Sequence, residues 1–169
     1  FINGQELANE DIIKWEKKRA NIVLKKLGVK PVSQNILSLR NQLLERKVEL
    51  GQKKIKQILK TELMISDPFA KLTAWLSCGR RRFSITEIFV ENAKAEQFVE
   101  WFEQCGKTNN ETAMLAGTPD HYVITTTKGI QEVIETNGGS PLVAKFYIDY
   151  EDLSSLRSNI DPTFPLQIA

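Results

Sequence analysis

The sequence predicts an α+β fold, in which an N-terminal helical hairpin or arm precedes a helix-covered, mostly antiparallel sheet. Three observations lead to this prediction. Apolar residues in the first third recur at the three- and four-residue spacing of amphipathic helices. Residues 121–150 instead contain strand-like runs separated by turn residues. Helical and strand-like segments are largely segregated along the chain, which is typical of α+β proteins.

Two helices are expected in the first third of the chain. The first begins near Asn9 or Asp11, either of which can cap it, and ends before Gly28. Pro31 prevents its continuation because it lacks a backbone N–H group. The second helix is longer and is expected to follow Ser33 as its N-cap residue, with Gly51 as the point where it breaks or bends.

The remainder of the chain is expected to contain helices and a sheet. A third helix should start at Asp67-Pro68, because proline is favoured at the first helical position. Asn92 is expected to cap the next helix, and a polar loop should lead from it to the hairpin with Lys128-Gly129 as its turn. A short helix is expected at 151–157. The expected strands are residues 83–90, 121–127, 130–136 and 142–150.

Charge is distributed unevenly between the two ends of the chain. Residues 1–60 hold 14 Lys and Arg against 6 Asp and Glu, whereas residues 61–169 hold 9 against 15. The charge changes sign near residues 61–66, so we expect a basic helical region at 1–65 and an acidic α+β domain at 66–169. Such asymmetry favours a polyanionic partner, above all nucleic acid. The alternative is an ordinary solvated, lysine-rich pair of helices.

A ridge of basic side chains is the candidate surface for nucleic acid. At about 100° per residue, Arg46, Lys53 and Lys60 lie on one side of the second helix, with Lys56 nearby. A cationic ridge can follow phosphates, because each neutralised phosphate releases counterions. The triplet Arg80-Arg81-Arg82 is a second candidate. The same helices are equally suited to a homodimer interface.

Several classes of protein are excluded or disfavoured by the composition. No apolar run approaches the roughly 18–20 residues that cross a bilayer. The start of the sequence lacks a signal-peptide pattern, and its two cysteines form no disulfide framework, so a cytoplasmic location without membrane association is expected. One histidine excludes a histidine-rich zinc site.

The hairpin carries the candidate chemistry. With Lys128-Gly129 as the turn, Asp120 should face Asn137 and Tyr122 should face Glu135. Asp120 and Glu135 would then share a face, with diagonal neighbours about 7–8 Å apart. Two carboxylates at that spacing can hold a hard divalent cation such as Mg²⁺. Ordinary acidic residues at the open end of a hairpin are the alternative interpretation.

This segment resembles the core of the PD-(D/E)xK metal-dependent nucleases. The resemblance rests on Pro119-Asp120 and on Val133-Ile134-Glu135. It implies that Asp120 and Glu135 bind the metal, and that a metal-bound water attacks phosphorus with a lysine nearby. Asn137 stands where the family has that lysine, so Lys145 on the next strand is the substitute candidate.

Three functional hypotheses follow. The first is a nucleic-acid-binding protein, either a Mg²⁺-dependent nuclease (a phosphodiesterase) or a degenerate relative. The second is an α+β module that binds a small ligand or a partner, with a basic helical arm for dimerisation or DNA binding, as in a regulator. The third is a non-nucleolytic enzyme whose remaining residues would lie beyond Ala169.

Overall fold

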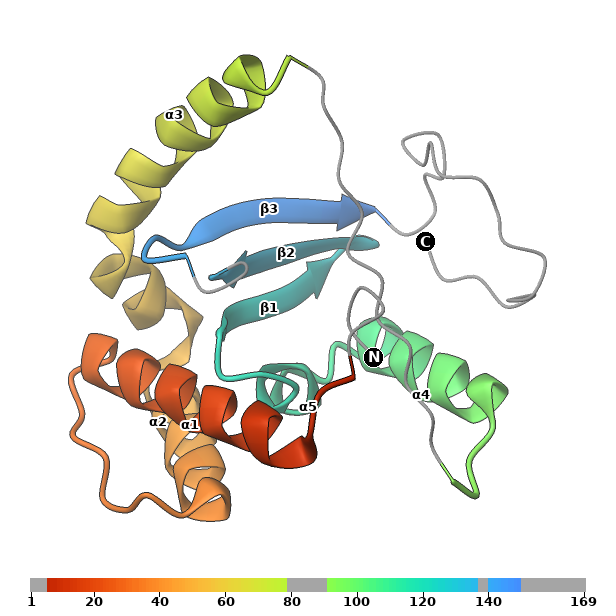
Figure 1. Cartoon of the computed structure of the whole chain (residues 1–169). Helices are drawn as coiled ribbons and strands as arrows, with labels where there is room; N and C mark the ends of the chain where they lie inside the picture. The colour runs from red at the N-terminus through yellow and green to blue at the C-terminus, as the bar shows by residue number, and fades with distance from the viewer. Residues whose placement is uncertain (1–5, 79–90, 137–139, 150–169) are drawn as a thin grey trace.

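The computed structural model describes residues 6–78, 91–136 and 140–149. Its described part contains five helices and a three-stranded antiparallel sheet, which confirms the predicted α+β class (Figure 1). The strand expected at 83–90, the triplet Arg80-Arg81-Arg82, Asn137 and the short helix expected at 151–157 lie outside the described residues.

The first two helices match the predicted ranges closely. They are α1, Asn9–Lys26, and α2, Ile36–Ile58. The N-cap of α1 is Ala8, with no capping hydrogen bond from a side chain, and not the predicted Asn9 or Asp11. The N-cap of α2 is Asn35 rather than Ser33, because the Asn35 side chain accepts hydrogen bonds from the N–H groups of the first helical turn, at 2.9 and 3.3 Å. Ser33 instead supports that cap, since its hydroxyl accepts from the Asn35 N–H at 3.0 Å.

Gly51 kinks α2, as expected. Its φ of 64° and ψ of 165° lie outside the helical region, in a conformation that is essentially restricted to glycine. The kink divides α2 into two segments that point in different directions. Side chains before and after Gly51 therefore do not continue one helical face.

The third helix, α3, runs Lys60–Leu76 and starts earlier than predicted. The prediction that Asp67-Pro68 begins a helix is wrong, because Pro68 lies in the helix interior. Leu59 is fully buried, and Leu63 packs on the same core, so the first turn of α3 is held in place by burial. The change of charge at residues 61–66 thus falls inside a continuous helix.

Two further helices precede the sheet. The expected helix after Asn92 is α4, Ala95–Lys107, but its N-cap is Lys94 and not Asn92. The polar loop contains an unpredicted helix α5, Glu111–Ala116. With six residues, α5 is too short to show a clear apolar period. Its local signal is the N-cap Asn110, whose side chain accepts from the Ala113 N–H at 3.1 Å.

The sheet has the strand order β1-β2-β3. Its strands are β1, His121–Thr127, β2, Ile130–Glu135, and β3, Ala144–Asp149. Lys128 and Gly129 have φ values of 54° and 81°, which confirms the predicted two-residue turn with both residues in the left-handed region. A bulge near the start of β1 shifts the pairing, so that Val123 lies opposite Ile134 but His121 lies opposite Glu135.

One hydrophobic core joins the helices to the sheet. The basic helices form one side of it, and β1, β2 and Val143, the residue just before β3, form the other (Figure 1). The buried apolar residues of this core are Ala20, Val23, Leu24, Leu27, Leu39, Leu43, Ile55, Leu59, Tyr122, Val123, Ile134 and Val143. Within the described ranges, no helix has the length and apolar character needed to cross a membrane.

Candidate functional site

Asp120, the first residue of the predicted metal site, forms a buried ion pair with Arg19 of α1. The Arg19 Nε lies 3.1 and 2.9 Å from the two carboxylate oxygens, and its Nη2 lies 2.6 Å from Oδ1. Thr136 completes the cluster, since its hydroxyl accepts from Arg19 at 3.0 Å and donates to Asp120 Oδ1. Arg19 and Asp120 are only 6% and 4% exposed, so this pair is shielded from solvent.

The predicted placement of Asp120 and Glu135 as diagonal neighbours on one face of the hairpin is wrong. Because of the β1 bulge, the backbone of Asp120 lies opposite Thr136, whose N–H donates to the Asp120 carbonyl at 3.4 Å. Glu135 pairs instead with His121, whose Nε2 lies 3.2 Å from Oε2. The extra residue of the bulge thus assigns the two carboxylates to different cross-strand pairs.

The described residues do not fit a magnesium ion held between Asp120 and Glu135. Both oxygens of Asp120 already accept charge-assisted hydrogen bonds from Arg19. Lys145 lies opposite Ile134, and its ammonium is 5.6 Å from the Tyr147 ring centre. No group of three or more His, Cys, Asp or Glu side chains suited to a metal gathers within the described ranges. Magnesium binding and catalysis by Asp120, Glu135 and Lys145 therefore stay predictions.

The basic ridge predicted for nucleic acid is interrupted. Arg46 donates to the Leu27 carbonyl at 3.2 and 3.1 Å and pairs with Glu49 at 2.9 Å. Beyond the Gly51 kink, Lys56 forms an ion pair with Glu132 on β2.

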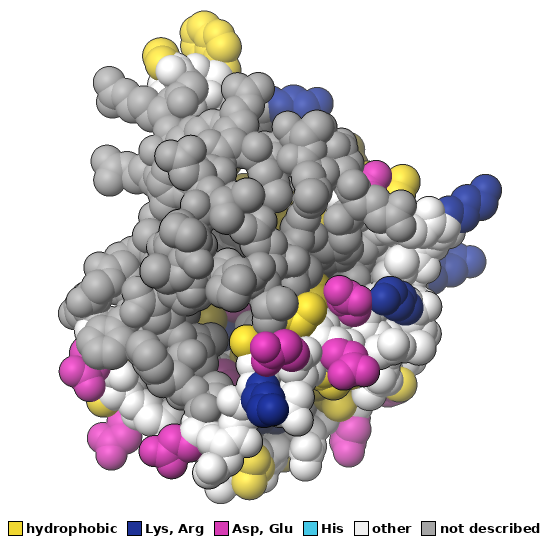
Figure 2. Space-filling model, turned by 90° about the vertical axis from the view of Figure 1, so that its right-hand side faces the viewer, with side chains coloured by type: hydrophobic (Ala, Val, Ile, Leu, Met, Phe, Trp, Pro, Cys, Tyr) yellow, Lys and Arg dark blue, Asp and Glu magenta, His cyan; other side chains and the backbone are white. Residues whose placement is uncertain are grey.

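Among the predicted nucleic-acid-binding residues that the structure describes, only Lys53 and Lys60 are exposed and form no ion pair with another described residue. On the face shown in Figure 2, the described surface carries acidic side chains interspersed with basic ones rather than one basic patch.

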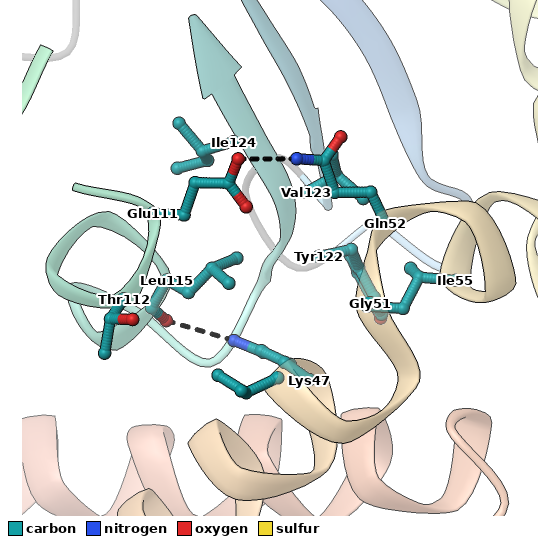
Figure 3. A pocket seen from close by; sticks show the side chains of 11 residues that line it. Lys47, Gly51, Gln52, Ile55, Glu111, Thr112, Leu115, Tyr122, Val123 and Ile124 are labelled. Atoms are coloured by element: carbon teal, nitrogen blue, oxygen red, sulfur yellow. Dashed lines mark hydrogen bonds between the residues drawn. The ribbon is translucent and has the colours of Figure 1, made fainter. Parts of the chain in front are cut away.

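A cavity of about 140 Å³ lies between α2, α5 and β1, at the kink of α2 (Figure 3). Its walls combine apolar side chains with an amine, a carboxylate, an amide and a phenol ring. The lining residues are Lys47, Val48, Gly51, Gln52, Ile55, Glu111, Thr112, Leu115, Tyr122, Val123 and Ile124. The sequence does not indicate this site, because residues 111–116 are predicted as part of a polar loop and not as helix α5.

Lys47 is the unusual residue of this cavity, with only 1% of its surface exposed. Its Nζ donates to the carbonyl oxygens of Leu115 and Thr118, at 3.2 and 3.3 Å. Burial removes water from the ammonium and lowers its pKa to about 7, an effect that the Asp120 charge opposes only in part. The sequence spacing does indicate that Lys47 is buried, because Lys47 continues the i, i+4 row of Leu39 and Leu43, which are both buried.

Two other polar groups line the cavity. Glu111 Oε1 accepts from Gln52 at 2.6 Å, from Thr125 at 3.0 Å and from Asn109 at 3.2 Å, which fixes this carboxylate in position. Tyr122 is fully buried, and its burial raises the pKa of the phenol. Its hydroxyl has no partner of ordinary hydrogen-bond geometry among the described residues.

This arrangement of side chains is suited to binding a small molecule. Polar groups at fixed positions around an apolar floor are typical of small-molecule sites, where a few polar groups orient the ligand.

In a comparison with models of known protein families, with curated proteins and with solved structures, no match to this chain is found.

Proposed function

We propose that this chain is a small-molecule-binding α+β module, and that its site is the cavity between α2, α5 and β1. The observation that carries this proposal is Lys47, a lysine buried at the wall of a cavity that three separate elements build. Burying a lysine ammonium is costly unless a partner compensates it. A bound molecule that contacts this wall would supply that compensation.

The size of the cavity limits the ligand. A volume of about 140 Å³ is close to that of the engineered protein cavity of about 150 Å³ that binds benzene. Pockets for drug-sized molecules occupy roughly 300–1,000 Å³. The ligand should therefore be a compound with on the order of six to ten non-hydrogen atoms, or the terminal group of a larger molecule.

A screen of small fragments by two-dimensional amide NMR tests this function. We expect a subset of fragments to shift the amide signals of Gln52, Leu115 and Val123 in a saturable way. Thr112 is exposed at the cavity wall, so Thr112→Phe should obstruct the site and abolish those shifts. Ala116→Phe is the matched control, because Ala116 is exposed on the same helix and does not line the cavity.

The outcome against the proposal is equally specific. If no fragment produces saturable shifts at the cavity, or if Thr112→Phe leaves those shifts unchanged, this function is wrong.

Nucleic-acid binding is the second candidate, supported by exposed lysines in the basic region that form no recorded ion pair. These residues are Lys14, Lys18, Lys25, Lys30, Lys53, Lys54 and Lys60. Binding through them should weaken steeply as salt rises, because it depends on counterion release. A fluorescence titration with duplex DNA at several salt concentrations tests this, and an affinity independent of salt would reject it.

A nuclease activity has its own test, which is cleavage of DNA in the presence of Mg²⁺. If the predicted metal site is used, Asp120→Ala and Glu135→Ala should each abolish cleavage. Unchanged cleavage in either variant would exclude that site.

A further inference from the structure

Lys47 lacks a counterion among the described residues. No carboxylate of the described residues forms an ion pair with it, and the acceptors of its ammonium are two neutral carbonyl groups. A lysine ammonium has three N–H donors, so these carbonyls leave one donor for another acceptor. Lys47 also lines the cavity, where such an acceptor can bind.

The titratable groups around Lys47 lie on α5, on β1 and just before β1. Asp120, before β1, is close enough to act on its charge, but this carboxylate is bound to Arg19 of α1. Tyr122 on β1 contributes a neutral phenol, since its pKa is raised. Glu111 on α5 contributes a carboxylate to the same cavity, held by its own three donors. None of these groups pairs with the ammonium.

We propose that the cavity selects a small monocarboxylate, whose carboxylate group binds the Lys47 ammonium and whose apolar body lies against Ile55, Leu115 and Val123. This inference rests on the proposed function, since it names the class of ligand that the same cavity binds. Charge-assisted hydrogen bonds of this kind are stronger than neutral ones.

Glu111 restricts the class further. A ligand with a second negative charge would place that charge in the same small cavity as the Glu111 carboxylate, which is unfavourable at low dielectric constant. Dicarboxylates and phosphate esters are therefore disfavoured. An uncharged end, apolar or hydroxyl-bearing, is compatible with the remaining walls.

Binding of a carboxylate should be coupled to uptake of a proton. With a pKa of about 7, Lys47 is mostly a neutral amine at pH 8, whereas the bound carboxylate stabilises the ammonium. The complex would take up about 0.9 proton at pH 8, and the affinity would fall by up to about tenfold per pH unit above pH 7.

The experiment compares three four-carbon probes, namely butyrate, butyramide and butylamine, on the whole chain. Amide NMR titrations at pH 7 and pH 9 measure affinity at the cavity. Calorimetry in phosphate and in Tris measures proton uptake, since the two buffers differ in ionisation enthalpy. We expect butyrate to bind at least tenfold more tightly than the other probes at pH 7, and to lose that advantage at pH 9.

Substitution of Lys47 gives a second, independent arm. Lys47→Met keeps most of the length of the side chain but removes the ammonium, and should weaken butyrate at least tenfold with little effect on butyramide. Lys53→Met is the matched control, because Lys53 is exposed on α2 and does not line the cavity. The comparison of probes on the unmodified chain does not depend on either variant folding.

The outcomes separate the two proposals. If butyramide binds the cavity as tightly as butyrate, or if Lys47→Met binds butyrate as tightly as the unmodified chain does, the carboxylate inference is wrong while small-molecule binding stands. The same holds if other fragments bind and butyrate does not. If neither the probes nor any fragment binds the cavity, both proposals fail.

Discussion

Arg19 on α1 and Asp120 at the start of the hairpin, 101 residues apart in the chain, form a buried ion pair with three hydrogen bonds. This pair connects the basic helical region to the sheet. Asp120, the acidic residue predicted as a metal ligand, is therefore bound by a cation of the protein itself. Part of the opposite charge of the two regions is thus neutralised within the molecule, because a cation of the basic region pairs with a carboxylate of the acidic region.

Breaking this pair should be strongly destabilising. Arg19→Met leaves Asp120 buried and without its main partner, so we expect a loss of about 3–5 kcal/mol in the free energy of unfolding. The double variant Arg19→Met, Asp120→Leu removes both charges and should recover most of that loss. Urea denaturation followed by circular dichroism measures all three proteins. A loss below about 1 kcal/mol for Arg19→Met would contradict the buried pairing.

Lys47 predicts an unusual dependence of stability on pH. Its pKa is about 7 in the folded chain and near 10.5 in the unfolded chain, so the unfolded state binds more protons between these values. The free energy of unfolding should therefore rise with pH from about 7 to 9.5, by a few kcal/mol. Above pH 10 the raised pKa of Tyr122 acts in the opposite direction, because the folded state then holds the extra proton.

Urea denaturation at a series of pH values between 7 and 9.5 measures this effect. Lys47→Met should remove the rise, and Lys53→Met should preserve it. A flat profile for the unmodified chain would show that Lys47 is not buried as described.

The kink at Gly51 should tolerate only glycine. An added Cβ would meet nothing within 4 Å, so the cost of Gly51→Ala comes from the backbone conformation alone. We expect a destabilisation of about 1–3 kcal/mol. Gly106→Ala is the matched control, because Gly106 lies inside α4 with open space around it and should gain up to about 1 kcal/mol. Thermal denaturation of both variants decides this, and equal effects would contradict the kink.

Burial distinguishes two leucines that look alike in the sequence. Leu24 is fully buried, whereas Leu76 near the end of α3 is 61% exposed. Leu24→Ala should cost about 2–5 kcal/mol through lost contacts and a residual cavity. Leu76→Ala should change stability by less than about 0.5 kcal/mol. Similar losses for the two variants in urea denaturation would show that the core is placed differently.

The sequence alone determined the α+β class, the first two helices and the hairpin with its turn at Lys128-Gly129. These features depend on interactions between near neighbours, such as the apolar period of a helix or the left-handed conformation of a turn residue. The same local signals did not locate the start of α3, where burial of Leu59 outweighs the helix-starting preference of Pro68.

Only the tertiary structure decided the roles of Asp120 and Lys47. A bulge of one residue removed Asp120 from the face of Glu135, and α1 brought Arg19 to it from 101 residues away. In the sequence, Lys47 is one of many cations of the basic region. In the folded chain, the packing of α5 and β1 against α2 buries it. The sequence gives the charge and type of each residue. Which charged groups are removed from water depends on contacts between segments that are distant in the chain. Removal from water determines both the pKa of an ionisable group and the free energy of burying it.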